Sequence, residues 1–111
     1  MQFVKDGDVY KVARITGSQD NILGVSFSDQ EARIEVVEWN VKQGAKVKSS
    51  SDQVLEQVLS GLREANQVIG KSYFLSKIYF LPSDSSSNSV YAFLIQELVK
   101  RLDRGGEFVE R

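Results

Sequence analysis

Residues 73–81 constrain the fold of this chain more than any other stretch of the sequence. They are rich in aromatic and aliphatic residues and end at Pro82, the only proline, so we expect a β-strand. Side chains alternate between the two faces of a strand. Both alternating sets are apolar here, with Tyr73, Leu75, Tyr79 and Leu81 in one and Phe74, Ile78 and Phe80 in the other. This pattern is typical of an inner strand that is covered on both faces.

Three more strands and two helices are predicted around this segment. Residues 9–15, 22–28 and 32–39 have strand-like composition or alternation and are separated by short polar turns, which favours an antiparallel meander. A helix over 54–69 follows from its apolar stripe, from a capping box at Ser50 and Gln53, and from Gly70 as terminator. A second helix is predicted over 90–103, before Gly105.

The predicted order is therefore β-β-β-α-β-α in an α+β fold. We expect a three-stranded antiparallel meander, extended by the fourth strand and packed against the two helices. The long helical connection between the third and fourth strands favours their parallel pairing or insertion in the same sheet. The length of 111 residues suits a single domain covering residues 1–111.

Composition narrows the chemistry that the chain can perform. It has no Cys and no His, which excludes disulfides, thiolate zinc sites, Cys nucleophiles and Ser-His-Asp catalysis. Its 14 basic and 15 acidic residues give a net charge of −1, which offers no support for binding to a phosphate backbone. We therefore expect a protein that is not an enzyme and has no metal or cofactor.

The apolar segments are short. The first eight residues are polar and acidic, unlike a secretory signal, and the longest apolar run, 90–95, is far below the ~20 residues that span a bilayer. These features predict a cytoplasmic protein that does not enter the membrane.

An alternative function comes from the order of the elements, which resembles the βββαβ core of nucleases of the restriction-endonuclease type. The resemblance implies an Asp and an E-x-K set that hold Mg²⁺ and activate water. Glu35 and Glu38 are the acidic residues of the corresponding strand, and neither is followed two positions later by Lys. They are either part of a carboxylate- and Mg²⁺-dependent site or solvent-facing charges.

Two loops suggest further alternatives. Lys42, Lys46 and Lys48 surround Gly44, and such a loop serves either a nucleic-acid-binding module or solubility. Residues 83–89 lie between a strand and a helix, where backbone N–H groups can hold an anion, but they contain no Gly or Lys and include Asp84. A simple capping loop is the competing interpretation.

The aromatic residues predict a binding surface. If both helices lie on one face of the sheet, segment 73–81 exposes one of its apolar rows on the other, and such a patch is typical of association surfaces. The candidate interface residues are Tyr10, Trp39, Tyr73, Leu75, Tyr79 and Leu81. If the helices cover opposite faces, the same residues belong to the core. The expected function is a small protein-binding, adaptor or inhibitor domain that acts through its sheet, with a homodimer as one form of association.

Overall fold

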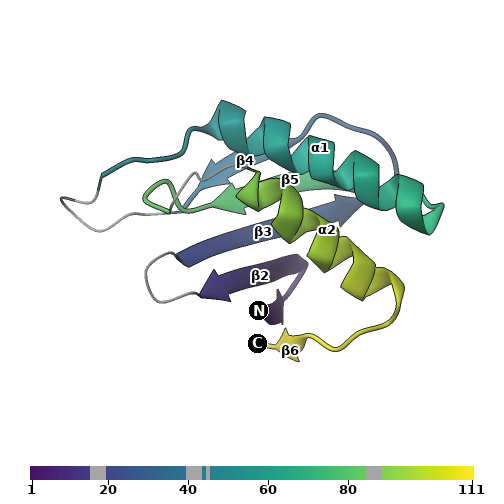
Figure 1. Ribbon diagram of the computed structural model, residues 1–111. Coiled ribbons are helices and arrows are strands. Elements are labelled where there is room, and N and C mark those ends of the chain that lie inside the picture. The colour runs from purple at the N-terminus through teal and green to yellow at the C-terminus, as the bar shows by residue number, and fades with distance from the viewer. Residues whose placement is uncertain (16–19, 40–43, 45, 85–88) are drawn as a thin grey trace.

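Six strands form one sheet, and two helices pack on it (Figure 1). The computed structural model describes residues 1–15, 20–39, 44, 46–84 and 89–111. In chain order the elements are β1 (Gln2–Asp6), β2 (Val9–Ile15), β3 (Asp20–Ser28), β4 (Glu35–Glu38), α1 (Ser51–Ile69), β5 (Phe74–Phe80), α2 (Val90–Asp103) and β6 (Val109–Glu110). Across the sheet the order is β4-β5-β3-β2-β1-β6. The predicted α+β class and the inner position of segment 73–81 are confirmed.

The pairing of the strands differs in detail from the expected meander. The antiparallel meander consists of β1, β2 and β3, and β5 adds to it antiparallel to β3. Strand β4, at 35–38 within the predicted 32–39, lies beyond β5 and pairs with it in parallel. The crossover through α1 explains this, because a parallel pair needs a long connection. Two short strands at the chain ends, β1 and β6, were not predicted; they pair in parallel.

Helix α1, over Ser51–Ile69, has the capping residues that the sequence predicts at both ends. Ser50 caps its first turn. The Ser50 hydroxyl accepts a hydrogen bond from the backbone N–H of Gln53 at 3.3 Å, and the Gln53 side-chain oxygen accepts one from the backbone N–H of Ser50 at 3.2 Å. The helix ends at Gly70, which adopts a left-handed conformation with φ 70°, and its N–H bonds to the Asn66 carbonyl. Local signals therefore fix this helix.

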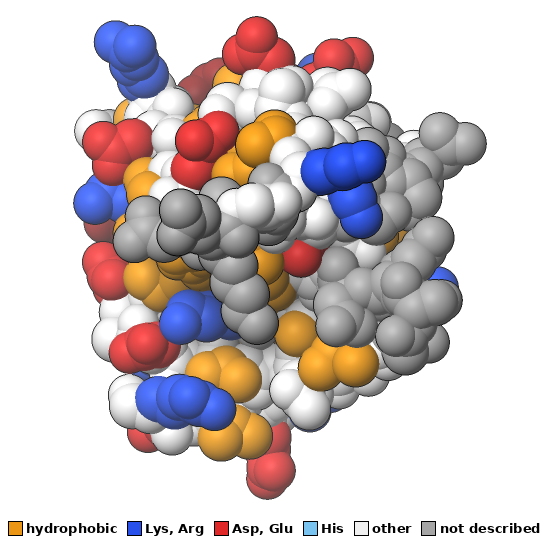
Figure 2. All heavy atoms as spheres, turned by 90° about the vertical axis from the view of Figure 1, so that its left-hand side faces the viewer, with side chains coloured by type: hydrophobic (Ala, Val, Ile, Leu, Met, Phe, Trp, Pro, Cys, Tyr) orange, Lys and Arg blue, Asp and Glu red, His pale blue; other side chains and the backbone are white. Residues whose placement is uncertain are grey.

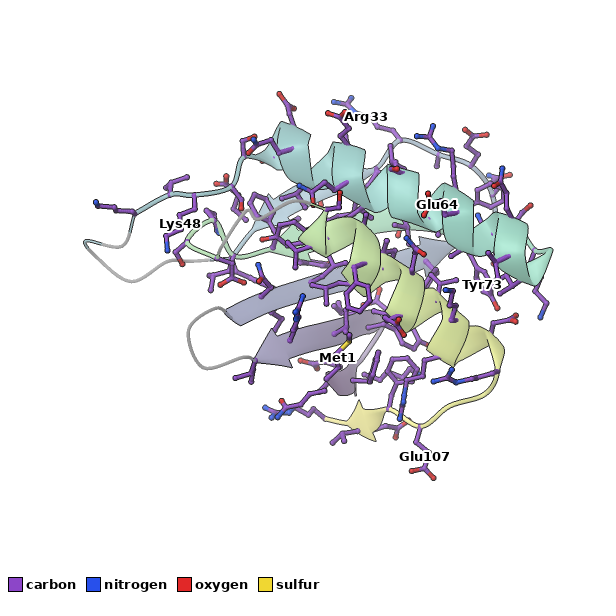
Figure 3. All side chains as sticks on the ribbon, in the orientation of Figure 1. Met1, Arg33, Lys48, Glu64, Tyr73 and Glu107 are labelled. Carbon is purple, nitrogen blue, oxygen red and sulfur yellow. The ribbon has the colours of Figure 1, made fainter. Side chains whose placement is uncertain are left out.

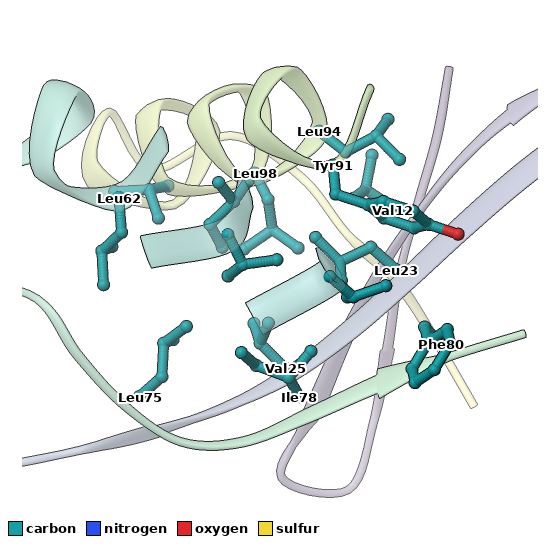
Figure 4. Packing of buried hydrophobic residues seen from close by; sticks show 14 of the residues in the cluster. Val12, Leu23, Val25, Leu62, Leu75, Ile78, Phe80, Tyr91, Leu94 and Leu98 are labelled. Carbon is teal, nitrogen blue, oxygen red and sulfur yellow. The ribbon is translucent and has the colours of Figure 1, made fainter. Parts of the chain in front are cut away.

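The hydrophobic core lies between one face of the sheet and both helices (Figures 1 and 4). Cross-strand neighbours Val12, Leu23 and Phe80 are all fully buried on that face, and Val25 pairs with buried Ile78 in the same way. The helices contribute Val54, Val58, Leu62, Ala65, Val90, Tyr91, Leu94, Ile95, Leu98 and Val99. Both α1 and α2 therefore lie on this face, and neither covers the opposite face of the sheet.

A β-bulge changes the alternation within β5. Ser26 pairs with Lys77 while the next residue, Phe27, pairs with Leu75, so Ser76 is an extra residue on β5. The bulge puts Leu75 on the same face as Ile78 and Phe80, although strict alternation predicts the opposite face. Leu75 is accordingly 2% exposed and belongs to the core.

Neither helix has the length and apolar character needed to cross a lipid bilayer, as far as the described residues show.

Candidate functional site: the helix-free face of the sheet

The sheet face opposite the helices is the candidate site and is called the free face below. Gly24 and Tyr79 each lie between two core residues of their strands, so they point to the free face. Cross-strand pairing places Lys11, Gly24, Tyr79 and Val37 in one row over four strands. The free face includes Val4, Lys11, Ala13, Ile22, Gly24, Val37, Trp39 and Tyr79.

Tyr79 of this row forms a stacked aromatic pair with Trp39, which directly follows β4. Their ring centroids are 5.8 Å apart and their planes differ by 15°. Gly24 makes room for the pair, because a Cβ at this position would lie 3.0 Å from Cη2 of Trp39 and 3.3 Å from Cβ of Tyr79. The backbone N–H of Trp39 donates to the Phe80 carbonyl at 2.8 Å, which continues the β4–β5 ladder by one residue and holds the Trp39 backbone next to β5.

The described charges around this pair are matched within the free face. The ammonium group of Lys11 lies 5.7 Å from the Trp39 ring centroid and 3.3 Å from the Asp6 carboxylate. On the other side, Lys77 lies 3.8 Å from Glu35. Both ion pairs are partly exposed to solvent and add little to stability. They do leave the surface around the aromatic pair without a strong excess of either sign.

A shallow hollow lies on the same face next to Lys11. Its volume is about 180 Å³, and its lining consists of Gln2, Val4, Lys11, Ala13, Ile22 and Arg111. The apolar floor comes from β1, β2 and β3. The free face therefore combines a half-buried aromatic pair with an adjacent depression.

Three of the six candidate interface residues, Tyr10, Tyr73 and Leu75, lie on the covered side of the sheet. Tyr10 and Tyr73 contact Phe27 edge-on under the helices, with ring centroids 5.5 and 5.8 Å apart. Leu75 is in the core, and Leu81 is half-buried just after β5. The structure brings Trp39 and Tyr79 together. Sequence reasoning missed Lys11 and Gly24, although a lone glycine inside an alternating strand is a known signal of close approach.

Two members of the predicted basic loop, Lys46 and Lys48, are exposed, and Lys42 lies outside the described residues. Lys48 lies on the segment that leads into α1 (Figure 3). Figure 2 views this end of the molecule and shows the described Lys and Arg side chains scattered among Asp and Glu. The described cations at this end do not gather into one patch.

The two carboxylates of the nuclease alternative are separated by the geometry of β4. Glu35 and Glu38 are both exposed, and three positions along a strand place them on opposite faces. Glu35 is on the free face, beside Lys77. Across the described part of the chain, no cluster of three or more acidic side chains is arranged to hold a metal ion.

The loop considered for anion binding is described at 82–84 and at Ser89. Asp84 is 8% exposed and accepts a hydrogen bond from the Ile22 amide at 2.9 Å, which ties this loop to β3. The backbone carbonyl of Asp84 also accepts from the hydroxyl of buried Ser49 at 3.2 Å. These contacts support the interpretation as a structural connection. Residues 85–88 lie outside the described part of the chain.

Comparisons with protein-family models, with curated proteins and with solved structures found no match for this chain.

Proposed function

We propose that this chain is a non-enzymatic protein-binding domain that acts through the free face, and that its partner is a second copy of the chain. One observation carries the proposal: the stacked Trp39–Tyr79 pair lies on a sheet face that neither helix covers. Trp and Tyr are enriched at protein interfaces and dominate their binding energy, because they bury a large apolar area and lose little conformational entropy.

The free face is suited to self-association. A two-fold interface uses the same patch on both subunits, so the patch must be complementary to itself. Here an aromatic pair and an apolar hollow lie side by side, and a two-fold axis between them would place the aromatic pair of each copy against the hollow of the other. The matched ion pairs at Lys11 and Lys77 remove any need for a strongly charged partner.

Pairing through the edge strand is a less favourable mode of association. An antiparallel contact between two copies of β4, centred between Val36 and Val37, would place Glu35 of one copy opposite Glu38 of the other. Like charges in this position are destabilising. Acidic residues on a short edge strand are a common protection against such pairing. The two copies should therefore meet face to face.

Sedimentation equilibrium over a concentration series tests the proposal, with fluorescence as a second readout. Trp39 is the only tryptophan, so its emission reports directly on the free face. We expect a dimer and a blue shift of the emission as concentration rises. Trp39→Ala and Tyr79→Ala should each weaken dimerisation by about tenfold or more, as expected of interface anchors.

Val68→Ala is the matched control, because Val68 is a large exposed apolar residue on α1, away from the sheet. This variant should dimerise like the wild type. A strict monomer at millimolar concentration, with tryptophan emission that does not change, would overturn the proposal. So would a dimer that Trp39→Ala leaves intact.

A further inference from the structure

A second candidate binding site lies on the outer side of α1. A groove of about 600 Å³ runs between this helix, residues 31–34 and the start of β5. From α1 it is lined by a row that extends from Leu55 to Asn66. The eleven steps from Leu55 to Asn66 along the helix measure about 16 Å, so the groove is long relative to a compact pocket. Its volume falls in the range of about 300–1,000 Å³ that is usual for small-molecule sites.

The groove exists because the edge strand is shorter than the helix beside it. Helix α1 has 19 residues and is about 28 Å long. Strand β4 has 4 residues, about 13 Å, and therefore covers less than half of the helix. Leu55 and Leu59 consequently stay half-buried on a stripe that neither α2 nor the sheet covers.

The interior of the groove is mainly apolar, and its one amide side chain, that of Asn66, is already hydrogen-bonded. The apolar residues of its lining are Ala32, Ile34, Leu55, Leu59, Leu62, Phe74 and Leu75. Asn66 also lines it, but its side chain donates to the Tyr73 carbonyl at 3.1 Å and accepts from the Tyr73 amide at 3.0 Å. A ligand inside the groove therefore does not have to satisfy the Asn66 side chain.

The charges along the groove favour an anion. Arg33 and Arg63 both line it and are exposed, and neither forms an ion pair with any residue that the structure describes. Glu31 is the one acidic residue in the lining. Figure 3 shows Arg33 beside α1 and Tyr73 near the end of the same helix. Guanidinium groups bind carboxylates through paired, charge-assisted hydrogen bonds.

We infer that this groove binds an amphiphile with an aliphatic chain and a carboxylate head, of the fatty-acid class. The chain lies along Leu55, Leu59 and Ile34, and the carboxylate reaches Arg33 and Arg63. A long apolar groove accommodates an unbranched chain better than a compact ring system. The site is separate from the free face and does not depend on the function proposed for that face.

Isothermal titration of the full chain with decanoate tests the inference. We expect saturable binding of one decanoate per chain. The double variant Arg33→Gln/Arg63→Gln should bind at least about tenfold more weakly, the change expected on loss of a charge-assisted contact. Glu31→Gln should bind more tightly, because it removes the acidic group that repels the ligand. Opposite signs for the two variants distinguish a carboxylate site from general adhesion to an apolar surface.

Three controls complete the design. Arg104→Gln removes an exposed arginine at the end of α2 and should bind decanoate like the wild type. Decanol should bind the wild type and the double arginine variant equally, since it lacks the charge. Trp39→Ala should retain decanoate binding, which keeps this result distinct from that for the free face. Absence of saturable binding, or equal affinity in the double variant, would overturn the inference and leave the groove to a macromolecular partner.

Discussion

The covered and free faces of the sheet carry similar aromatic residues in different surroundings. On the covered face Tyr10 contacts Phe27 and Phe108 edge-on at 5.5 and 5.3 Å, so each ring is part of a connected cluster. On the free face Trp39 and Tyr79 lie nearly parallel. The covered cluster joins β1, β2 and β3 to the C-terminal segment, whereas the free pair has solvent beyond it. The sheet face on which an aromatic residue lies therefore decides whether it packs in a cluster or stays at the surface.

Replacing neighbouring residues of β5 should show the largest difference between the faces. Phe80 is fully buried on the covered side and the adjacent Tyr79 is half-buried on the free side. We expect Phe80→Ala to lower the free energy of unfolding by about 3–5 kcal/mol. Tyr79→Ala should lower it by about 1 kcal/mol, because its site is open to water. Urea unfolding measures both, and equal losses would contradict the assignment of the faces.

Substitution of Gly61 and of Gly24 by alanine compares the packed interior with the free face in a second way. A Cβ on Gly61 would lie 2.3 Å from the Ala92 carbonyl oxygen, where α1 crosses α2. Gly61→Ala should therefore destabilise by about 1–3 kcal/mol despite the better helix propensity of alanine.

Gly24→Ala is the matched change on the free face. The new Cβ would approach the Trp39 ring at 3.0 Å, and the half-buried indole can shift toward solvent. We expect a loss below about 1 kcal/mol in urea unfolding, together with a changed tryptophan emission. If Gly24→Ala destabilised as strongly as Gly61→Ala, the aromatic pair would be part of a rigid core.

The smallest expected effect is a pH dependence of stability that arises from Asp103 at the edge of the covered side. Asp103 accepts from Lys71 at 2.6 Å and from the Tyr73 hydroxyl at 3.0 Å. The hydrogen bond with Lys71 holds the pKa of Asp103 below its ordinary value, and the same bond raises the pKa of Lys71. Burial, followed by the bond to Asp103, raises the pKa of Tyr73.

The directions of these pKa shifts define the pH range in which the Asp103 contacts stabilise the fold. A lowered carboxyl pKa stabilises the fold above the ordinary value of about 3.9, and the effect is lost as pH falls through the lowered pKa. The raised pKa values of Lys71 and Tyr73 stabilise below about 10 and are lost as pH rises through them. Wild type and Asp103→Asn should differ most in urea midpoint near neutral pH and converge in acid. A constant difference from pH 2 to 7 would contradict this.

Some differences between expectation and structure arise from signals present in the sequence. Strand β1 pairs with β2 through a two-residue turn at Gly7 and Asp8, where Gly7 has φ 62°. A Gly-Asp pair between two strand-like runs is a recognised hairpin signal. The polar and acidic character of the first eight residues favoured an irregular N-terminal segment over a strand. Strand β6 has two residues, too few for any period to be visible.

The sequence alone determined the features that depend on neighbours along the chain. The capping box at Ser50 and the stop at Gly70 are local interactions, and the doubly apolar segment 73–81 required an inner strand wherever it paired. The tertiary structure decided which residues share a face. The extra residue at Ser76 sends Leu75 to the core, parallel pairing brings β4 next to β5, and the short β4 leaves the groove along α1 open. These outcomes depend on register between segments far apart in the chain, and a shift of one residue moves every following side chain to the other face.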